Sequence, residues 1–186
     1  MRARPTGSSI LLALLLAGGA RSASEPELLG RVDALLGSYR TVTVAEWRAL
    51  GSDAAPLLER VARDRAALPT RRARALAALG AVRPAAAGAL IRELVAQDTA
   101  PVVLRCAAVD AAPGVLGPAA AEVLLPLLGD QEGTLRLRSA RVLAASGPGG
   151  CRALSTRART LPTSDPVART AARCEAQLRA SPTSDR

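Results

Sequence analysis

The sequence contains no lysine, histidine, asparagine or phenylalanine, and only one tryptophan and one tyrosine among its 186 residues. Without histidine, the chain lacks the commonest general base and metal ligand of proteins. Without lysine, it cannot form the Schiff bases on which many covalent mechanisms depend. It also has no glycine-rich phosphate loop of the GxxxxGK type. These absences lead us to expect a protein that is not an enzyme and that holds no cofactor.

Cysteine is scarce as well. Cys106, Cys151 and Cys174 have no CxxC spacing, so we expect no metal site. Paired carboxylates remain as a catalytic alternative, because Glu59 and Glu93 could face one another across neighbouring helices, as carboxylates do in glycoside hydrolases. Charged residues on a solvated helix face explain the same two residues more simply, and we favour that interpretation.

Aromatic residues make up only 1% of the chain, although 49% of it is hydrophobic. The hydrophobic residues are mostly alanine, leucine and valine, whereas strands favour β-branched and aromatic side chains. Alanine and leucine are also strong helix formers. We therefore predict an all-α fold whose core depends on the close approach of helices over alanine.

Residues 1–24 have the features of a secretory signal peptide. The basic start MRARPTGSS is followed by the apolar run ILLALLLAGGA and by the small residues RSAS. This run is well short of the roughly 20 residues that span hydrocarbon, and no cysteine follows it for lipid attachment. We expect cleavage between Ala20 and Ser24, a periplasmic or extracellular location, and no membrane span in the mature chain.

The positive charge is concentrated toward the C-terminus. Residues 25–130 contain 12 Arg and 12 acidic residues, whereas residues 131–186 contain 10 Arg and 4 acidic residues. Solvated helix faces account for this excess, and the alternative is a surface for lipid headgroups, polysaccharide or an acidic protein. We expect no nucleic-acid partner, because the protein is expected to be exported and has almost no aromatic side chains to stack on bases.

One short pattern recurs four times. The segments TRRARALAALG, LRCAAVDAAPG, LRSARVLAASG and ARTAARCEAQL each contain an arginine followed by small and apolar residues at helical spacing. Aligned on that arginine, they are separated by 33, 33 and 31 residues, a period typical of stacked repeats. Each segment is expected to form the second helix of a repeat, and the first three should end near Gly80, Pro113 and Gly147. The aligned arginines are Arg72, Arg105, Arg138 and Arg169.

The first helix of each repeat is expected before this segment, over residues 54–64, 84–98 and 118–130. Pro84 and Pro118 stand in the first turn of their helices, where a missing N–H costs nothing. Pro126 lies inside the third of these helices and should kink it. An aspartate separates the two helices of each repeat: Asp64, Asp98, Asp130 or Asp165.

The motif DPVARTAA at residues 165–172 and the ALG ending at residues 78–80 resemble HEAT repeats, and the resemblance extends over residues 52–180. It implies a right-handed α-solenoid of about four to five antiparallel helix pairs. It also implies a polar ladder between repeats, with the individual pairings open. The ladder would place Asp98, Asp130 and Asp165 near Arg72, Arg105 and Arg138, and Arg169 continues the arginine series. The pattern departs from the family at APGVLG in the second unit and at Gln177 in the last, so the stack should be irregular.

Residues 25–51 fit a degenerate first repeat that closes one end of the domain of residues 25–180. Its second helix carries Trp47, which we expect to cover the end of the stack, as terminal repeats do. We favour this role for the side chain over the stacking of a ligand. Residues 181–186 are expected to form a disordered tail.

Together these features favour an exported, non-catalytic scaffold that binds a protein partner along its second helices. The alternatives are a structural or regulatory subunit of an envelope complex, bound along the edge of the stack, and a binder of an anionic partner. The arginines that could project from the second helices are Arg71, Arg74, Arg141 and Arg173.

Export would place the cysteines in an oxidising compartment, where disulfides persist. In a helix pair that turns near residues 162–164, Cys151 and Cys174 lie almost equally far from the turn and should be neighbours. We therefore predict a bridge between them and expect Cys106 to be a buried free thiol. The alternative is three unpaired cysteines that fill small gaps in the core.

Overall fold

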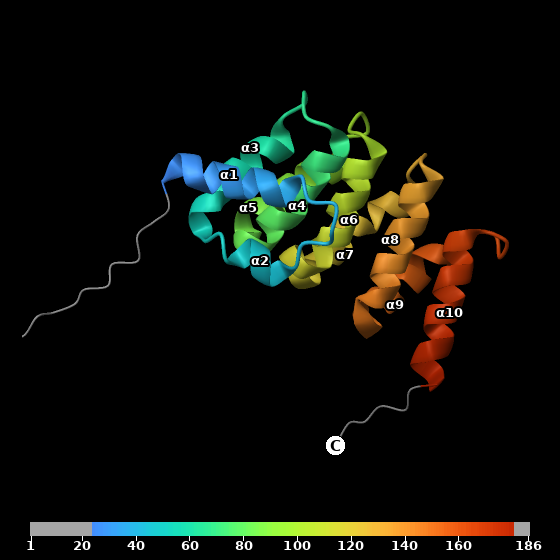
Figure 1. Cartoon of the computed structure of the whole chain (residues 1–186). Coiled ribbons are helices and arrows are strands. Elements are labelled where there is room, and N and C mark those ends of the chain that lie inside the picture. Colours follow the sequence, from blue (N-terminus) through green and yellow to red (C-terminus); the bar gives the residue numbers. More distant parts are fainter. Residues whose placement is uncertain (1–23, 181–186) are drawn as a thin grey trace, which may run out of the picture.

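The computed structural model describes residues 24–180, and their regular elements are all helices (Figure 1). The all-α prediction is confirmed, because no strand occurs in this part of the chain. The expected signal peptide, apart from Ser24, and the expected tail lie outside the described residues. The elements are α1 (Glu25–Leu36), α2 (Val44–Arg48), η1 (Ser52–Ala54), α3 (Ala55–Arg63), α4 (Pro69–Val82), α5 (Pro84–Ala96), α6 (Val102–Leu116), η2 (Gly117–Ala119), α7 (Ala120–Leu124), η3 (Pro126–Gly129), α8 (Gly133–Ala145), α9 (Gly147–Ala158) and α10 (Pro166–Ala180).

Local sequence signals set where several helices begin. Helices α4, α5 and α10 start at Pro69, Pro84 and Pro166, where the fixed φ of proline suits the first turn. Helix α2 starts with a capping box: the Thr43 hydroxyl accepts from the Glu46 backbone N–H, and the Glu46 carboxylate accepts from the Thr43 backbone N–H.

The core is built from leucine and alanine. Many alanines are completely buried, among them Ala62, Ala75, Ala108 and Ala140. Such small side chains let helices approach closely, so the large side chains can fill the interior at high density without aromatic rings. The largest fully buried side chains are Leu58, Leu76, Leu79, Leu90, Ile91, Leu104, Leu124, Leu135, Leu143, Leu154, Val32 and Val109.

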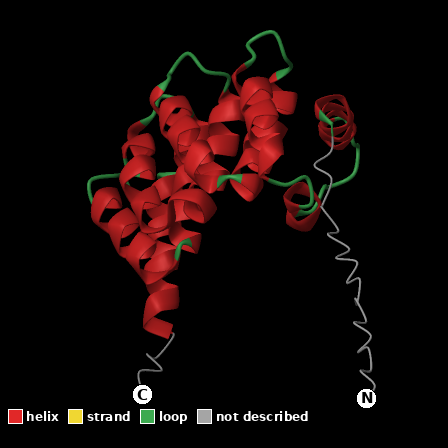
Figure 2. Cartoon of the chain, turned by 90° about the vertical axis from the view of Figure 1, so that its left-hand side faces the viewer, coloured by secondary structure: helices red, strands yellow, loops and turns green. Residues whose placement is uncertain are grey.

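Two sets of contacts arrange the helices. Helices that follow one another pack together, as α3 does with α4, α5 with α6 and α9 with α10. In addition, α4 contacts α6, α6 contacts α8 and α8 contacts α10, so these four helices lie side by side (Figure 1). We call them the second-helix layer. Helix α5 contacts both α3 and α7 on the other side, and short loops join the helices at their ends (Figure 2).

Helices α1 and α2 cover the N-terminal end of the second-helix layer. Helix α1 lies across the other helices and is seen end-on in Figure 2, and both α1 and α2 pack against α4. The Trp47 side chain on α2 is buried at this end. Its burial agrees with the covering role expected from the sequence.

Two predicted helix ends are wrong, and close packing explains both. Helix α4 runs through Gly80, and α6 runs through Pro113. A Cβ atom on Gly80 would lie 3.1 Å from Val115 Cγ2, and one on Gly88 would lie 3.1 Å from Leu116 Cδ2. The extra turn of α6 thus places two apolar side chains against glycines of α4 and α5. The break expected near Gly147 is confirmed, because α8 ends just before it.

The helix expected over residues 118–130 is broken instead of kinked. Its residues form η2, α7 and η3, of which α7 ends at Leu124 and η3 begins at Pro126. Proline has no N–H for the α-helical ladder and its ring clashes with the preceding turn. The break shortens this element and opens space beside α5.

Candidate functional site

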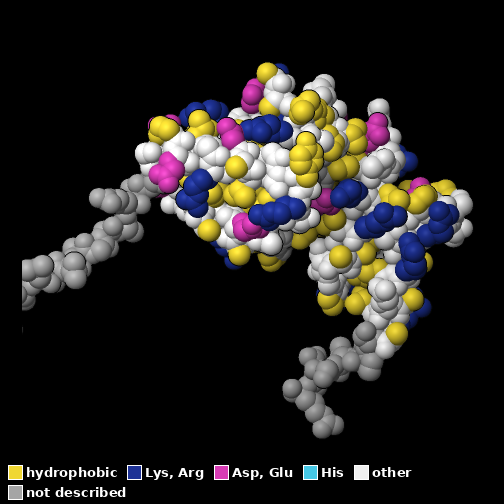
Figure 3. Space-filling model, viewed as in Figure 1, with side chains coloured by type: hydrophobic (Ala, Val, Ile, Leu, Met, Phe, Trp, Pro, Cys, Tyr) yellow, Lys and Arg dark blue, Asp and Glu magenta, His cyan; other side chains and the backbone are white. Residues whose placement is uncertain are grey.

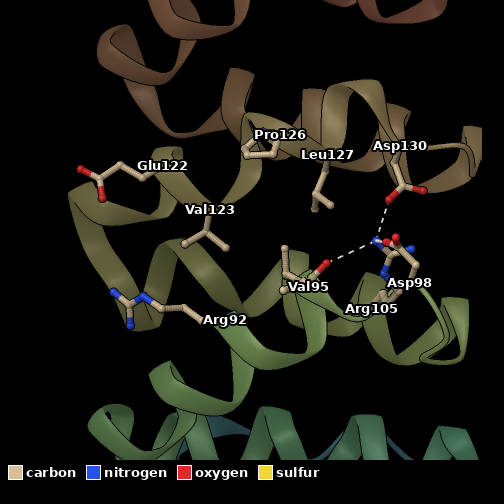
Figure 4. A pocket seen from close by; sticks show the side chains of 10 residues that line it. Arg92, Val95, Asp98, Arg105, Glu122, Val123, Pro126, Leu127 and Asp130 are labelled. Carbon is tan, nitrogen blue, oxygen red and sulfur yellow. Dashed lines mark hydrogen bonds and ion pairs between the residues drawn. The ribbon is translucent and has the colours of Figure 1, made fainter.

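Arg105 lies at the centre of a buried polar cluster. Its Nη2 atom donates to the Val95 carbonyl at 3.2 Å, to Asp98 Oδ1 at 3.3 Å and to Asp130 Oδ2 at 2.6 Å (Figure 4). The Arg105 side chain is 3% exposed and that of Asp130 is 10% exposed, whereas that of Asp98 is 91% exposed. One guanidinium therefore joins α6 to the end of α5 and to the turn after η3.

The Asp130 carboxylate is held in its charged form. Burial by itself would raise the pKa of this carboxyl, but hydrogen bonds from the Glu132 backbone N–H and the Arg105 guanidinium together keep the pKa below its ordinary value. The Glu132 N–H lies 2.9 Å from Asp130 Oδ1. The two carboxylate oxygens thus have different partners, which fixes the orientation of the turn.

A pocket of about 390 Å³ opens beside this cluster, between α5 and the broken α7–η3 segment (Figure 4). Arg92 and Glu122 lie at one end and the Arg105 cluster at the other, with apolar side chains such as Val95 and Val123 between them. Both acids near Arg105 are already engaged by it. The pocket therefore combines apolar walls with charged ends, and we assign no catalytic acid–base pair to it.

Arg72 and Arg105 play equivalent structural roles in the helix pairs α3–α4 and α5–α6. Each is buried, and each donates to the backbone carbonyl ten residues earlier: Arg72 Nε to Ala62 at 3.0 Å, and Arg105 to Val95. In both helix pairs the arginine ties the later helix to the end of the earlier one. Only Arg105, within the described residues, also pairs with turn aspartates of the expected ladder.

The rest of the expected ladder is not formed. Arg138 pairs with Asp110 of α6 instead of a turn aspartate, and Arg169 donates to the Ser164 carbonyl. Asp165 accepts the backbone N–H of Val167 at 2.7 Å and so begins α10. The physical reason is position on the helix: Arg138 and Arg169 lie on exposed faces of α8 and α10, where they cannot reach a buried turn.

Two of the four arginines expected on the binding face contact α1 and the loop after it, at the N-terminal end of the described chain. Arg71 pairs with Asp33 of α1, and Arg74 Nη1 donates to the Leu36 carbonyl at 2.9 Å and also to the Ser38 carbonyl. These contacts tie one nitrogen of each guanidinium to α1 and the loop that follows it. Arg71 and Arg74 are therefore engaged within the chain, and whether they also face a partner stays a prediction.

The other two, Arg141 and Arg173, are exposed on α8 and α10. Figure 3 shows basic side chains gathered over these two helices, with few acidic ones among them. We define the arginine surface as Arg138, Arg141, Arg169 and Arg173. Within the described part of the chain, Arg138 is the member of this surface that has an acidic partner.

The cysteines are arranged as the helix-pair argument predicts. Cys151 on α9 and Cys174 on α10 have Cα atoms 5.8 Å apart and are joined by a disulfide, and both are buried. Cys106 is free and buried on α6, and burial raises the pKa of its thiol. A thiol with a raised pKa is a poor nucleophile, so Cys106 acts as a small core residue.

Glu59 and Glu93 are linked by Arg63, which pairs with both of them. Arg63 Nε donates to Glu59 Oε1 at 3.0 Å, and Nη1 donates to Glu93 Oε2 at 2.5 Å. One guanidinium thus bridges both exposed carboxylates, which argues against an acid–base pair. Residues 24–180 also contain no group of three or more His, Cys, Asp or Glu side chains able to hold a metal ion.

Asp110 and Arg63 were missed by sequence reasoning, although each left a signal. Arg63 follows Glu59 by four residues on one helix, a spacing at which opposite charges meet. Asp110 is an exposed acid of α6, whose other charged residue, Arg105, is buried, so an opposite charge on its exposed face has to come from another helix. Periodicity alone could not name that partner.

No protein-family model, curated protein or solved structure matches the chain. The stretch Val102–Leu124 is long and apolar enough to cross a membrane by length and composition, with a mean hydropathy of 1.3. In the structure this stretch is interrupted at Gly117, where φ is 55°, and α6 buries Arg105 while packing against α4, α5 and α8. Of the apolar window in this stretch, 33% is buried in the structure.

Proposed function

We propose that this protein is an exported, non-catalytic scaffold that binds a protein partner in the cell envelope through its second-helix layer. The proposed architecture is a HEAT-like right-handed α-solenoid with an N-terminal cap. The successive contacts of α4, α6, α8 and α10 carry this proposal, because stacked helix pairs create an extended surface of one helix per repeat. Unpaired arginines on the last two of these helices support binding at that surface.

Export is supported by two independent features. One is the basic and apolar pattern of residues 1–20, and the other is the disulfide between Cys151 and Cys174, which suits an oxidising compartment. The test is to express the chain with its own N-terminus in a bacterium and to measure the mass of the periplasmic product. We expect a chain that starts between Ala20 and Ser24; an uncleaved cytoplasmic chain would contradict export.

Partner binding is tested with a photoreactive amino acid at two exposed positions. One replaces Ala145 on α8, in the second-helix layer, and the matched control replaces Thr156 on α9. We expect a discrete cross-linked protein from position 145 and none from position 156 in cells that contain the native envelope. A cross-link from position 156 alone would favour an edge-bound subunit, and none from either position would contradict the proposal.

A further inference from the structure

The C-terminal helices α8, α9 and α10, two of which carry the arginine surface, hold the least neutralised charge of the described chain. Residues 133–180 contain nine arginines but only two acidic residues, Asp165 and Glu175. Glu175 is taken up by Arg179 on the same helix, and Asp165 accepts a backbone N–H. Within the described residues, Arg141 and Arg173 of this surface have no acidic partner, whereas Arg138 pairs with Asp110 and Arg169 donates to the Ser164 carbonyl.

A groove adjoins this surface. It has a volume of about 460 Å³ and lies between α6 and α8. Its apolar part is formed by Leu137 and Val142, which are half-buried, and its rim by Arg141 and the Arg138–Asp110 pair. Apolar contact and positive charge are thus offered side by side on the second-helix layer.

We infer that the groove and the arginine surface bind an acidic peptide segment of the partner, with one or two apolar side chains in the groove and carboxylates on the arginines. This inference rests on the proposed function and names the chemistry of its partner. Charge complementarity supports it, because bidentate arginine–carboxylate pairs are strong and directional. Neighbouring helix axes lie about 8–10 Å apart, so about four extended residues, at roughly 3.3–3.6 Å each, span the distance from the groove to α10.

A membrane surface and a polysaccharide fit these residues less well. Peripheral binding to lipid uses exposed apolar side chains that enter the interface, and the large exposed hydrophobic residues in the described chain, such as Val103, lie outside residues 133–180. Residues 133–180 also contain no aromatic side chain on which a sugar ring could stack. A peptide uses both the apolar groove and the guanidinium groups.

The test measures binding of a fluorescein-labelled peptide in which two leucines interrupt a run of six glutamates. The purified protein, with its disulfide intact, is compared with Arg141→Glu/Arg173→Glu and with the matched control Arg152→Glu/Arg157→Glu on α9. Both double variants change the net charge equally, and circular dichroism checks that each is folded. We expect the first variant to weaken binding at least tenfold, or about 1.4 kcal/mol, and the control to weaken it less than about threefold.

Two further measurements use the groove itself. Replacing both leucines of the peptide by serine should weaken binding several-fold, because only a peptide that fills the groove uses its apolar part. Asp110→Asn should strengthen binding, because it removes an acid from the rim and frees Arg138. Equal losses in the two double variants, or no effect of the serine peptide, would overturn the inference.

Anionic vesicles and heparin are tested in parallel with the peptide. Binding to either that depends on Arg141 and Arg173, without peptide binding, would overturn the inference in favour of a lipid or polysaccharide surface. A cross-linked partner at position 145 without peptide binding would leave the proposed function standing and refute its acidic-peptide chemistry. Failure of both experiments would refute both.

Discussion

Replacing Arg105 by alanine should destabilise the protein more than any other arginine substitution tested beside it. The guanidinium is nearly inaccessible and serves the Val95 carbonyl and the Asp130 carboxylate, both largely buried, while Asp98 is exposed and adds little. Each buried group left without a donor costs about 1–3 kcal/mol. Asp130 keeps its bond from the Glu132 backbone N–H, so we expect a total loss of about 3 kcal/mol in the free energy of unfolding.

The measurement is thermal and urea unfolding followed by circular dichroism. A loss of about 3 kcal/mol corresponds to a melting temperature lower by roughly 6–12 °C for a domain of this size. Arg138→Ala is the matched control, since it removes an exposed pair and should cost less than about 1 kcal/mol. Adding Asp130→Asn to Arg105→Ala should restore part of the loss by removing the unpaired charge. Equal losses in Arg105→Ala and Arg138→Ala would refute the reasoning.

Other perturbations probe the disulfide, the pH dependence and the helix packing. Replacing Cys151 and Cys174 by alanine should cost about 3 kcal/mol, and thiol titration of the unfolded, unreduced wild type should find one free thiol, not three. Because the pKa of Asp130 is lowered on folding, its charged carboxylate stabilises the folded state. This contribution is complete above about pH 4 and is lost as pH falls through the folded-state pKa. Asp130→Asn should therefore flatten the acid limb of the stability curve, and an unchanged slope would contradict this. Gly150→Ala should lower the free energy of unfolding by at least about 2 kcal/mol, because the new Cβ would lie 2.3 Å from a backbone carbonyl oxygen of α8. Gly149→Ala is the control, since a Cβ there meets nothing within 4 Å. Similar melting temperatures for the two variants would disprove the close approach at Gly150.

Helix positions were predictable from sequence because prolines and apolar spacing act locally. Pro69, Pro84 and Pro166 begin helices for a reason contained in a few residues. Helix ends were less predictable. Whether Gly80 ends a helix or admits a neighbouring side chain depends on Val115, 35 residues away in the chain. Tertiary packing decides between these outcomes, and helix propensity, which depends on the local sequence alone, does not describe it.

The alignment of the four segments on their arginines was also wrong in the last two segments, because arginine is a poor marker of equivalent helix positions. In α4 and α6, Arg72 and Arg105 are followed by buried residues three, four and seven positions later. In α8 the same buried pattern follows Arg136, and in α10 it follows Val167. The apolar spacing, not the identity of the first residue, is what packing requires. The positions equivalent to Arg105 are therefore Arg136 and Val167, each two residues before the arginine that the alignment chose.

This register connects the buried cluster with the arginine surface. At the position of Arg105, α8 has the half-buried Arg136, which donates to the Asp130 carbonyl at 2.8 Å, and α10 has a buried valine. The internal polar contact is thus most extensive at Arg105 on α6, is made by a half-buried arginine on α8, and is replaced by an apolar residue on α10. A two-residue offset turns a helical side chain by about 200°, so Arg138 and Arg169 point away from the core. Helices α8 and α10 therefore bury no arginine in the core, and the exposed guanidinium groups of Arg141 and Arg173 remain available to an acidic partner.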